Sequence, residues 1–293
     1  MKCSEGLRCL YTNLDTFNNK RAELEARIAE LKPDIIGLTE VKPKNATWEL
    51  ANHDISLEGY TLYSNLEGRG SALYVNEKLG SAEVKMSVDV ESTVWCKIPL
   101  KDRDSLLVGV VYRSPNASEQ QNGQLNRMIG DILGEAYSHV LIMGDFNYPE
   151  INWEMQVSTA SAGHSSQEFL TSIHDSYLYQ HVTEPTHHRA QQRANILDLV
   201  MTNESGMIHN LSYGEPIGKS HHSVLDWTFR CYQPRPATKV KKYLYDKGNF
   251  SEIREMLGGF DWANVLCGKS ADDICVAISA AILTAVEKSV PHR

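Results

Sequence analysis

Short apolar runs that end in a carboxylate or an amide recur along this 293-residue chain, and they constrain its fold more than any other feature. In residues 141–147, an apolar run containing Gly144 leads directly into Asp145 and Asn147. This pattern predicts a buried strand that ends on a turn glycine, and the two-residue spacing directs both polar side chains to one face. One such pair is most often only a turn. Its repetition is therefore what carries information.

Four other segments repeat the arrangement: Asn13 follows residues 7–11, Glu40 follows residues 34–39, Asp198 lies within residues 195–200, and His221 and His222 precede residues 223–225. A lone charge inside an apolar strand is costly unless it is paired or bound to a metal. Because α/β sheets gather polar residues at strand ends, the set predicts a phosphodiesterase site that uses a divalent metal.

The ordered set resembles the endonuclease/exonuclease/phosphatase family, which includes abasic-site endonucleases. The residues that carry this likeness are Asn13, Glu40, Tyr112 with Asn116, Asp145 with Asn147, Asp198 and the triplet 220–222. Residues 11–13, 19–21, 33–40, 111–116 and 196–200 more narrowly resemble the endonuclease of LINE-type (non-LTR) retrotransposons. The likeness extends over residues 7–230.

The pattern of expected elements agrees with the fold that this resemblance implies. Helical periodicity is found in residues 18–31, 121–135 and 167–177. Strands are expected at residues 62–64, 71–76, 84–88, 94–98, 106–112 and in the segment beginning at Val140. We therefore expect a four-layer αββα sandwich of two mixed β-sheets flanked by helices.

The resemblance also implies roles for the site residues. Glu40, with Asn13, would hold Mg²⁺ or Mn²⁺ through oxygen ligands. Asp145 would orient or deprotonate the attacking water, and Asn147 would fix the phosphate.

The remaining implied roles concern the charge that develops on the phosphate. Tyr112 and Asn116 would donate hydrogen bonds to its oxygens. His222 would stabilise the pentacoordinate phosphorane, while Asp198 would orient His222 or complete the metal shell.

His221 departs from the family pattern, in which the last motif reads Ser-Asp-His. By the resemblance, that aspartate supports the catalytic histidine, and a histidine at the same position cannot supply its negative charge. Loss of acid-base assistance removes about 10² to 10⁴ in rate. The substitution therefore predicts a weakened enzyme.

The net charge of −8 provides little general attraction for DNA, whose nonspecific affinity comes from contacts of Lys and Arg with phosphates. Local contacts would have to supply the affinity for DNA, and the candidate residues are Arg113, Arg193 and Trp153. His187 and His188 are interpreted as part of a surface recognition loop rather than a metal site.

The composition changes near residue 233, which divides the chain into a domain at 1–232 and a linker with a helical segment at 233–293. Helices are expected at residues 249–257 and 271–290. By the resemblance, this segment would precede a reverse transcriptase, in a longer polyprotein or in a truncated or domesticated copy.

The six cysteines have no CxxC spacing and are interpreted as reduced thiols. The polar start of the chain contains no secretory leader, and the apolar run at residues 276–286 is too short to cross a bilayer. We therefore expect a nuclear or cytoplasmic protein that is not secreted and not bound to a membrane.

The leading hypothesis is a Mg²⁺-dependent endonuclease that nicks one strand of double-stranded DNA for retrotransposition. A second hypothesis, motivated by His221, is a DNA- or partner-binding module that has lost turnover. A third is a phosphatase or phosphodiesterase that acts on a small molecule.

Overall fold

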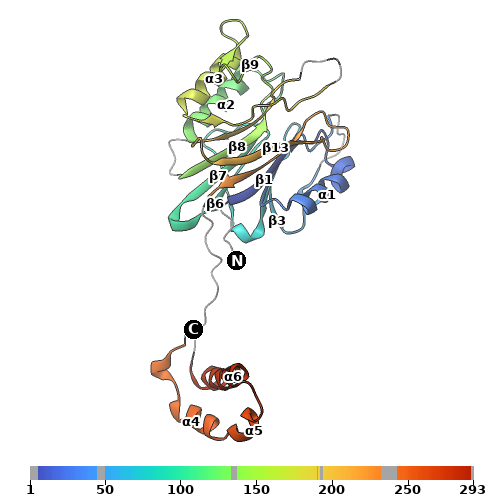
Figure 1. Cartoon of the computed structure of the whole chain (residues 1–293). Helices are drawn as coiled ribbons and strands as arrows, with labels where there is room; N and C mark the ends of the chain where they lie inside the picture. Colours follow the sequence, from blue (N-terminus) through green and yellow to red (C-terminus); the bar gives the residue numbers. More distant parts are fainter. Residues whose placement is uncertain are drawn as a thin grey trace. The chain divides into compact units, whose positions relative to one another are not determined.

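Two six-stranded sheets packed face to face form the larger part of the molecule (Figure 1). The computed structural model describes residues 6–44, 50–132, 137–189, 191, 194–231 and 243–291. The chain divides into two units, Met1–Pro234 and Arg235–Arg293.

The first sheet, sheet A, has the strand order β13-β14-β1-β2-β4-β3. Its strands are β1 (Gly6–Asn13), β2 (Ile35–Thr39), β3 (Tyr60–Asn65), β4 (Ser71–Asn76), β13 (Ile208–Gly214) and β14 (Val224–Arg230). β1 and β2 are parallel, and the other neighbours are antiparallel.

The second sheet, sheet B, has the order β11-β12-β8-β7-β6-β5. Its strands are β5 (Ala82–Glu83), β6 (Thr93–Pro99), β7 (Ser105–Tyr112), β8 (His139–Asp145), β11 (Tyr179–Gln180) and β12 (Asp198–Thr202). β7 and β8 are parallel, so both sheets are mixed as expected. A short separate hairpin joins β9 (Ile151–Asn152) to β10 (Val157–Ser158).

Three apolar cores separate the layers. The central core fills the space between the sheets and contains Tyr11, Leu73, Val108, Met143 and Val200, among others. α1 (Arg21–Leu31) packs on the outer face of sheet A, whereas α2 (Glu119–Ile132) and α3 (Ser165–Asp175) pack on the outer face of sheet B. The predicted four-layer αββα sandwich is confirmed (Figure 1).

Most of the expected elements lie where the sequence placed them. The helix expected at residues 18–31 consists of a 3₁₀ turn, η1 (Asn18–Lys20), followed by α1, which ends at Lys32 in the left-handed conformation before Pro33. The end of the helix expected at 121–135 lies partly outside the described residues.

The strand expected at residues 84–88 is wrong, because strand pairing ends with β5 at Glu83. Val84, Met86, Val88 and Val90 are partly buried and pack against the core beneath α2 and α3. Their alternation therefore reflects packing on that core and not a strand ladder.

Gly144 is a strand residue and not the predicted turn glycine, because β8 continues to Asp145. A Cβ at this position would lie 2.0 Å from the carbonyl oxygen of Val111 on β7. The missing side chain therefore allows β7 and β8 to approach each other one residue before the acid.

The second unit contains η5 (Tyr245–Lys247), α4 (Phe250–Gly258), α5 (Trp262–Leu266) and α6 (Ala271–Ser289). The helices expected at 249–257 and 271–290 correspond to α4 and α6, whereas α5 was not expected. α6 buries Ala281 and Ala285 but leaves Val276 and Leu283 exposed. No helix in the described part of the chain is long and apolar enough to cross a membrane.

Candidate active site

A row of polar side chains crosses one end of sheet B. Tyr112 is the last residue of β7, Asp145 the last of β8 and Asp198 the first of β12. The strand register makes both Tyr112 and Asp198 direct neighbours of Asp145. Three residues that lie far apart in the sequence are therefore fixed side by side by strand pairing.

Sheet A brings a second set to the same place. Asn13 ends β1 and is paired with Thr39, the last residue of β2, so that Glu40 follows immediately. Asn13 Nδ2 donates a hydrogen bond of 2.8 Å to Asp145 Oδ2, and Tyr11 Oη donates one of 3.0 Å to Asp198 Oδ1. The site is thus bonded across the interface between the two sheets.

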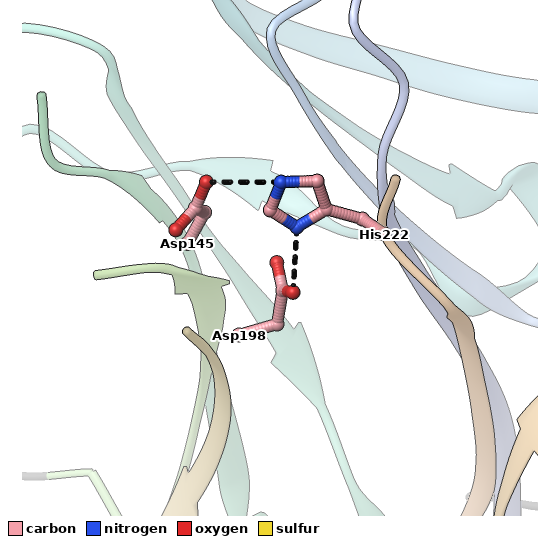
Figure 2. Close-up of side chains that lie close together, drawn as sticks. All are labelled: Asp145, Asp198 and His222. Carbon is pink, nitrogen blue, oxygen red and sulfur yellow. Dashed lines mark hydrogen bonds and ion pairs between the residues drawn. The ribbon is translucent and has the colours of Figure 1, made fainter. Parts of the chain in front are cut away.

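His222 lies between the two buried aspartates (Figure 2). Its Nδ1 is 2.7 Å from Asp198 Oδ2, and its Nε2 is 3.9 Å from Asp145 Oδ2. The Nδ1 contact fixes the orientation of the ring and leaves Nε2 directed at Asp145. In the structure, Asp198 therefore orients the histidine.

Burial and mutual charge shift the proton affinities of this cluster. Burial and the nearby carboxylate of Asp198 raise the pKa of Asp145 to about 8, although His222 opposes the shift. Burial lowers the pKa of His222, but the ion pair with Asp198 outweighs it and the pKa rises to about 9. His222 is therefore an imidazolium at neutral pH.

Tyr112 remains a neutral hydrogen-bond donor. Burial raises the pKa of its hydroxyl, and the carboxylates of Glu40 and Asp145 raise it further.

Beside the buried cluster lies a more exposed one made of Asp15, Glu40 and Arg69. We call Asp15 and Glu40 the acidic pair. Arg69 Nη2 is 2.7 Å from Asp15 Oδ1 and also contacts Glu40 Oε2. Both acids have left-handed backbone, with φ of 43° at Asp15 and 52° at Glu40. Such conformations are uncommon for residues other than glycine and often occur at functional sites.

Backbone hydrogen bonds hold these loops next to each other. The N–H of Thr16 donates to the carbonyl of Glu40 at 2.7 Å, and that of Lys42 donates to Arg69 at 2.9 Å. The buried Lys20 donates through Nζ to the carbonyls of Leu14 and Asp15. Within the 19–21 motif, Lys20 therefore stabilises the loop that carries Asp15.

Two groups of side chains have the chemistry to hold a divalent cation. Asp145, Asp198 and His222 offer ligand atoms within 4.8 Å of one another, but Nδ1 of His222 and Asp198 are already bonded to each other. Asp15 and Glu40 offer carboxylate oxygens that already converge on one cationic group, as Mg²⁺ and Mn²⁺ require. The residues present therefore fit a hard divalent ion at the acidic pair, next to Asp145.

Asn13 has its side chain engaged at both ends. Its Nδ2 binds Asp145, and its Oδ1 accepts the backbone N–H of Asp15 at 3.0 Å. In this structure the predicted metal ligand thus positions the carboxylate of Asp145 and the backbone of Asp15.

Asn147 and Asn116 lie in neighbouring loops. Asn147 donates through Nδ2 to the carbonyl of Arg113 at 2.9 Å, and its backbone N–H donates to Asp145 Oδ1 at 3.2 Å. Asn147 therefore orients the acid and secures its loop. The side chain of Asn116 is exposed in the loop between β7 and α2.

The three predicted DNA contacts differ in position. Arg113 is buried, with its guanidinium 3.8 Å from the Tyr148 ring and bonded to Asn122 and the carbonyl of Asn147. This inward orientation makes Arg113 a support of the site in the structure, and its contact with DNA stays a prediction. Trp153 is half-buried and lines a hollow of 910 Å³ beside the β9–β10 hairpin, whereas Arg193 lies outside the described residues.

The weakened activity expected from His221 stays a prediction, but the carboxylate that supports His222 in this structure is Asp198. The His221 side chain is exposed, and its ring lies 6.0 Å from that of His187. The substitution therefore leaves the support of His222 intact.

The sequence analysis did not predict the contact of Tyr11 with Asp198 or that of Arg69 with Glu40. His187 was placed in a surface loop, yet its ring is half-buried and lies 4.8 Å from that of His222. Burial and the neighbouring His222 lower the pKa of His187 to about 4, so it is neutral at physiological pH. The buried position of Tyr11 in an apolar run gave no signal of a polar partner.

Comparison with known proteins agrees with this geometry. The family model described as endonuclease-reverse transcriptase matches residues 106–226, which include Tyr112, Asp145, Asp198 and His222. A comparison with curated proteins finds no match. The match to this family model confirms the expected likeness to endonuclease-reverse transcriptase proteins.

Solved structures share the fold at low sequence identity. The endonuclease domain of TRAS1, a telomere-specific non-LTR retrotransposon, has a TM-score of 0.60 and 15% identity over 78% of this chain and 100% of its own. The AP endonuclease LMAP from Leishmania major has a TM-score of 0.59 and 13% identity over 76% of this chain and 88% of its own. The APE2 catalytic domain of Xenopus laevis has a TM-score of 0.58 and 16% identity over 80% of this chain and 94% of its own.

Proposed function

We propose that this chain is a divalent-metal-dependent endonuclease that nicks one strand of double-stranded DNA. The observation that carries the proposal is the Asp145–His222–Asp198 cluster, in which a buried acid faces an imidazolium that a second buried acid orients. The match to endonuclease-reverse transcriptase proteins and the shared fold support the same class of reaction.

The two central groups have proton affinities suited to hydrolysis at mildly alkaline pH, between the pKa of Asp145 at about 8 and that of His222 at about 9. Asp145, with its pKa raised to about 8, accepts a proton from the attacking water and orients its lone pair. A base with a pKa in this range combines adequate basicity with a useful fraction in the ionised form. Asn13 and the backbone of Asn147 hold the carboxylate in place.

His222 and Tyr112 stabilise the charge that develops on the phosphate. The imidazolium donates through Nε2 to a phosphate oxygen, and Asp198 keeps the ring charged and oriented. The neutral hydroxyl of Tyr112 donates a further hydrogen bond. Because these donors are positioned before substrate arrives, little reorganisation is needed during the reaction.

Glu40 and Asp15 would hold the metal, which when bound supplies Lewis-acid stabilisation of the phosphate and the leaving oxygen. By the same likeness, a reverse transcriptase region of a longer polyprotein is the proposed partner, and the nick would leave a 3′-hydroxyl for priming. A nuclear or cytoplasmic location belongs to the same proposal.

Nicking of supercoiled plasmid in Mg²⁺ or Mn²⁺ tests the proposal. We expect the chain to convert supercoiled to open-circular DNA and Asp145→Asn to lower the rate by about 10³-fold. Asp226→Asn is the matched control, because this β14 acid contacts Ser212 outside the cluster. Tight duplex binding without nicking would instead favour the binding module, and release of phosphate from a small substrate would favour the phosphatase.

A further inference from the structure

Arg69 occupies the place of a cation between two carboxylates, and its contacts are unequal. Its Nη2 forms ion pairs with both Asp15 and Glu40. Its Nη1 is buried and, among the residues that the structure describes, has no hydrogen-bond partner. A buried N–H without a partner loses its hydration without replacement and destabilises the pose.

The backbone that presents the two carboxylates is held by contacts that do not involve Arg69. Both acids have left-handed φ, and the Thr16 N–H bond to Glu40 ties their loops together. Asn13 Oδ1 additionally binds the N–H of Asp15. The backbone of the acidic pair is therefore prearranged, so that both side chains would stay close to each other if the guanidinium moved away.

A hollow also lies next to Arg69. Arg69 lines a hollow of 540 Å³, together with Tyr112, Ser92 and Lys44. A side chain that leaves the acidic pair can therefore turn into this hollow without displacing the core.

We propose that Arg69 is the resident counter-cation of the Asp15–Glu40 pair and competes with the divalent metal for it. This inference rests on the proposed metal dependence of the site. A monovalent guanidinium with one unsatisfied nitrogen neutralises the pair only in part, whereas a divalent ion offers more charge to prearranged oxygens. Arg69 thus sets the metal concentration at which the site becomes loaded.

Mn²⁺ binding to the full chain without DNA tests the inference, with free Mn²⁺ measured by electron paramagnetic resonance and Mg²⁺ added as a competitor. We expect Arg69→Gln to bind Mn²⁺ about 10-fold more tightly, because a competing positive charge at ion-pair distance is removed. Arg69→Lys keeps the charge and should bind close to the wild-type level. Arg127→Gln removes one charge from the exposed face of α2 and should change nothing.

The sign of the change distinguishes competition from support. If Arg69 were needed to hold the two carboxylates together, Arg69→Gln would bind Mn²⁺ more weakly, and the inference would be overturned. Equal binding by all four proteins would overturn it as well, while leaving the proposed nuclease intact. If wild type and every variant fail to bind Mn²⁺, the proposed metal dependence fails together with the inference. Melting temperatures measured by circular dichroism show that each variant is folded.

Discussion

Two acidic clusters lie next to each other at the same end of the sandwich, and each contains two carboxylates and one cationic side chain. In the inner cluster, strand pairing places Asp145 and Asp198 side by side, and buried His222 is the cation. In the outer cluster, loops with left-handed backbone present Asp15 and Glu40, and Arg69 is the cation. The inner cluster is suited to proton transfer because its groups are buried and shifted in pKa, whereas the outer one is suited to exchange ions with solvent.

The largest effect should come from removing the inner cation. His222→Gln should lower plasmid nicking by about 10³-fold, since it removes the charged donor to the phosphate. His209→Gln on the exposed strand β13 provides the matched control. A variant that retains more than a tenth of wild-type nicking would show that the inner cluster is not the reaction centre.

Removing the orienting acid should have a smaller effect that depends on pH. Asp198→Asn should lower nicking by about 10²-fold and move the pH profile to lower pH. The sign follows because Asp198 raises the pKa of both His222 and Asp145. The measurement is the initial nicking rate between pH 5 and pH 10, with Asp226→Asn as control. An unshifted profile would show that Asp198 does not set the pKa of His222 or of Asp145.

The inner cluster should also lower the stability of the fold as pH rises. Asp145 has a folded pKa of about 8, above the reference value of 3.8, so the folded state binds its proton more tightly than the unfolded state. Stability should therefore fall as pH rises from 3.8 towards 8. We expect Asp145→Asn to melt at a higher temperature than wild type, with a difference that widens over this range.

Melting curves at several pH values check this expectation, and Asp226→Asn should show no such trend. His222 acts in the same direction, because its raised pKa of about 9 gives stability that is complete below 6.5 and lost as pH passes 9. A difference between Asp145→Asn and wild type that is independent of pH would mean that the acid is not buried in its charged form.

The smallest effect belongs to His221. Because Asp198 already supports His222, His221→Asp should change nicking at saturating Mg²⁺ by no more than a few-fold. His188→Asp, on an exposed neighbour whose backbone N–H binds the His221 carbonyl, provides the control. A gain of two orders of magnitude specific to His221→Asp would restore the idea that the last motif is defective.

The two clusters also differ in how far the sequence predicts them. Asp145 and Asp198 could be found because each interrupts or ends an apolar run, and a buried sheet leaves few places for a charge. The sandwich followed from similar patterns, with the exception of residues 84–88, where alternation serves packing without pairing.

Arg69 could not be found in this way. It lies in a Gly-Arg-Gly turn, 29 residues from Glu40, and only loop closure brings it to the acidic pair. The partner of His222 was predicted only as one of two roles for Asp198, and the structure shows the contact between these two side chains. Contacts between loops and between strands depend on tertiary geometry, which local patterns do not encode.

Tyr11 and Asn13 of sheet A form hydrogen bonds with Asp198 and Asp145 of sheet B. The geometry of the reaction centre therefore depends on the distance between the two sheets. A substitution in the central core that pushes the sheets apart by a fraction of an ångström would lengthen these bonds while most of the apolar contacts survived. Catalysis should therefore be lost before the fold is lost. The tolerance of this core to substitution is consequently set by the chemistry at its edge and not by stability alone.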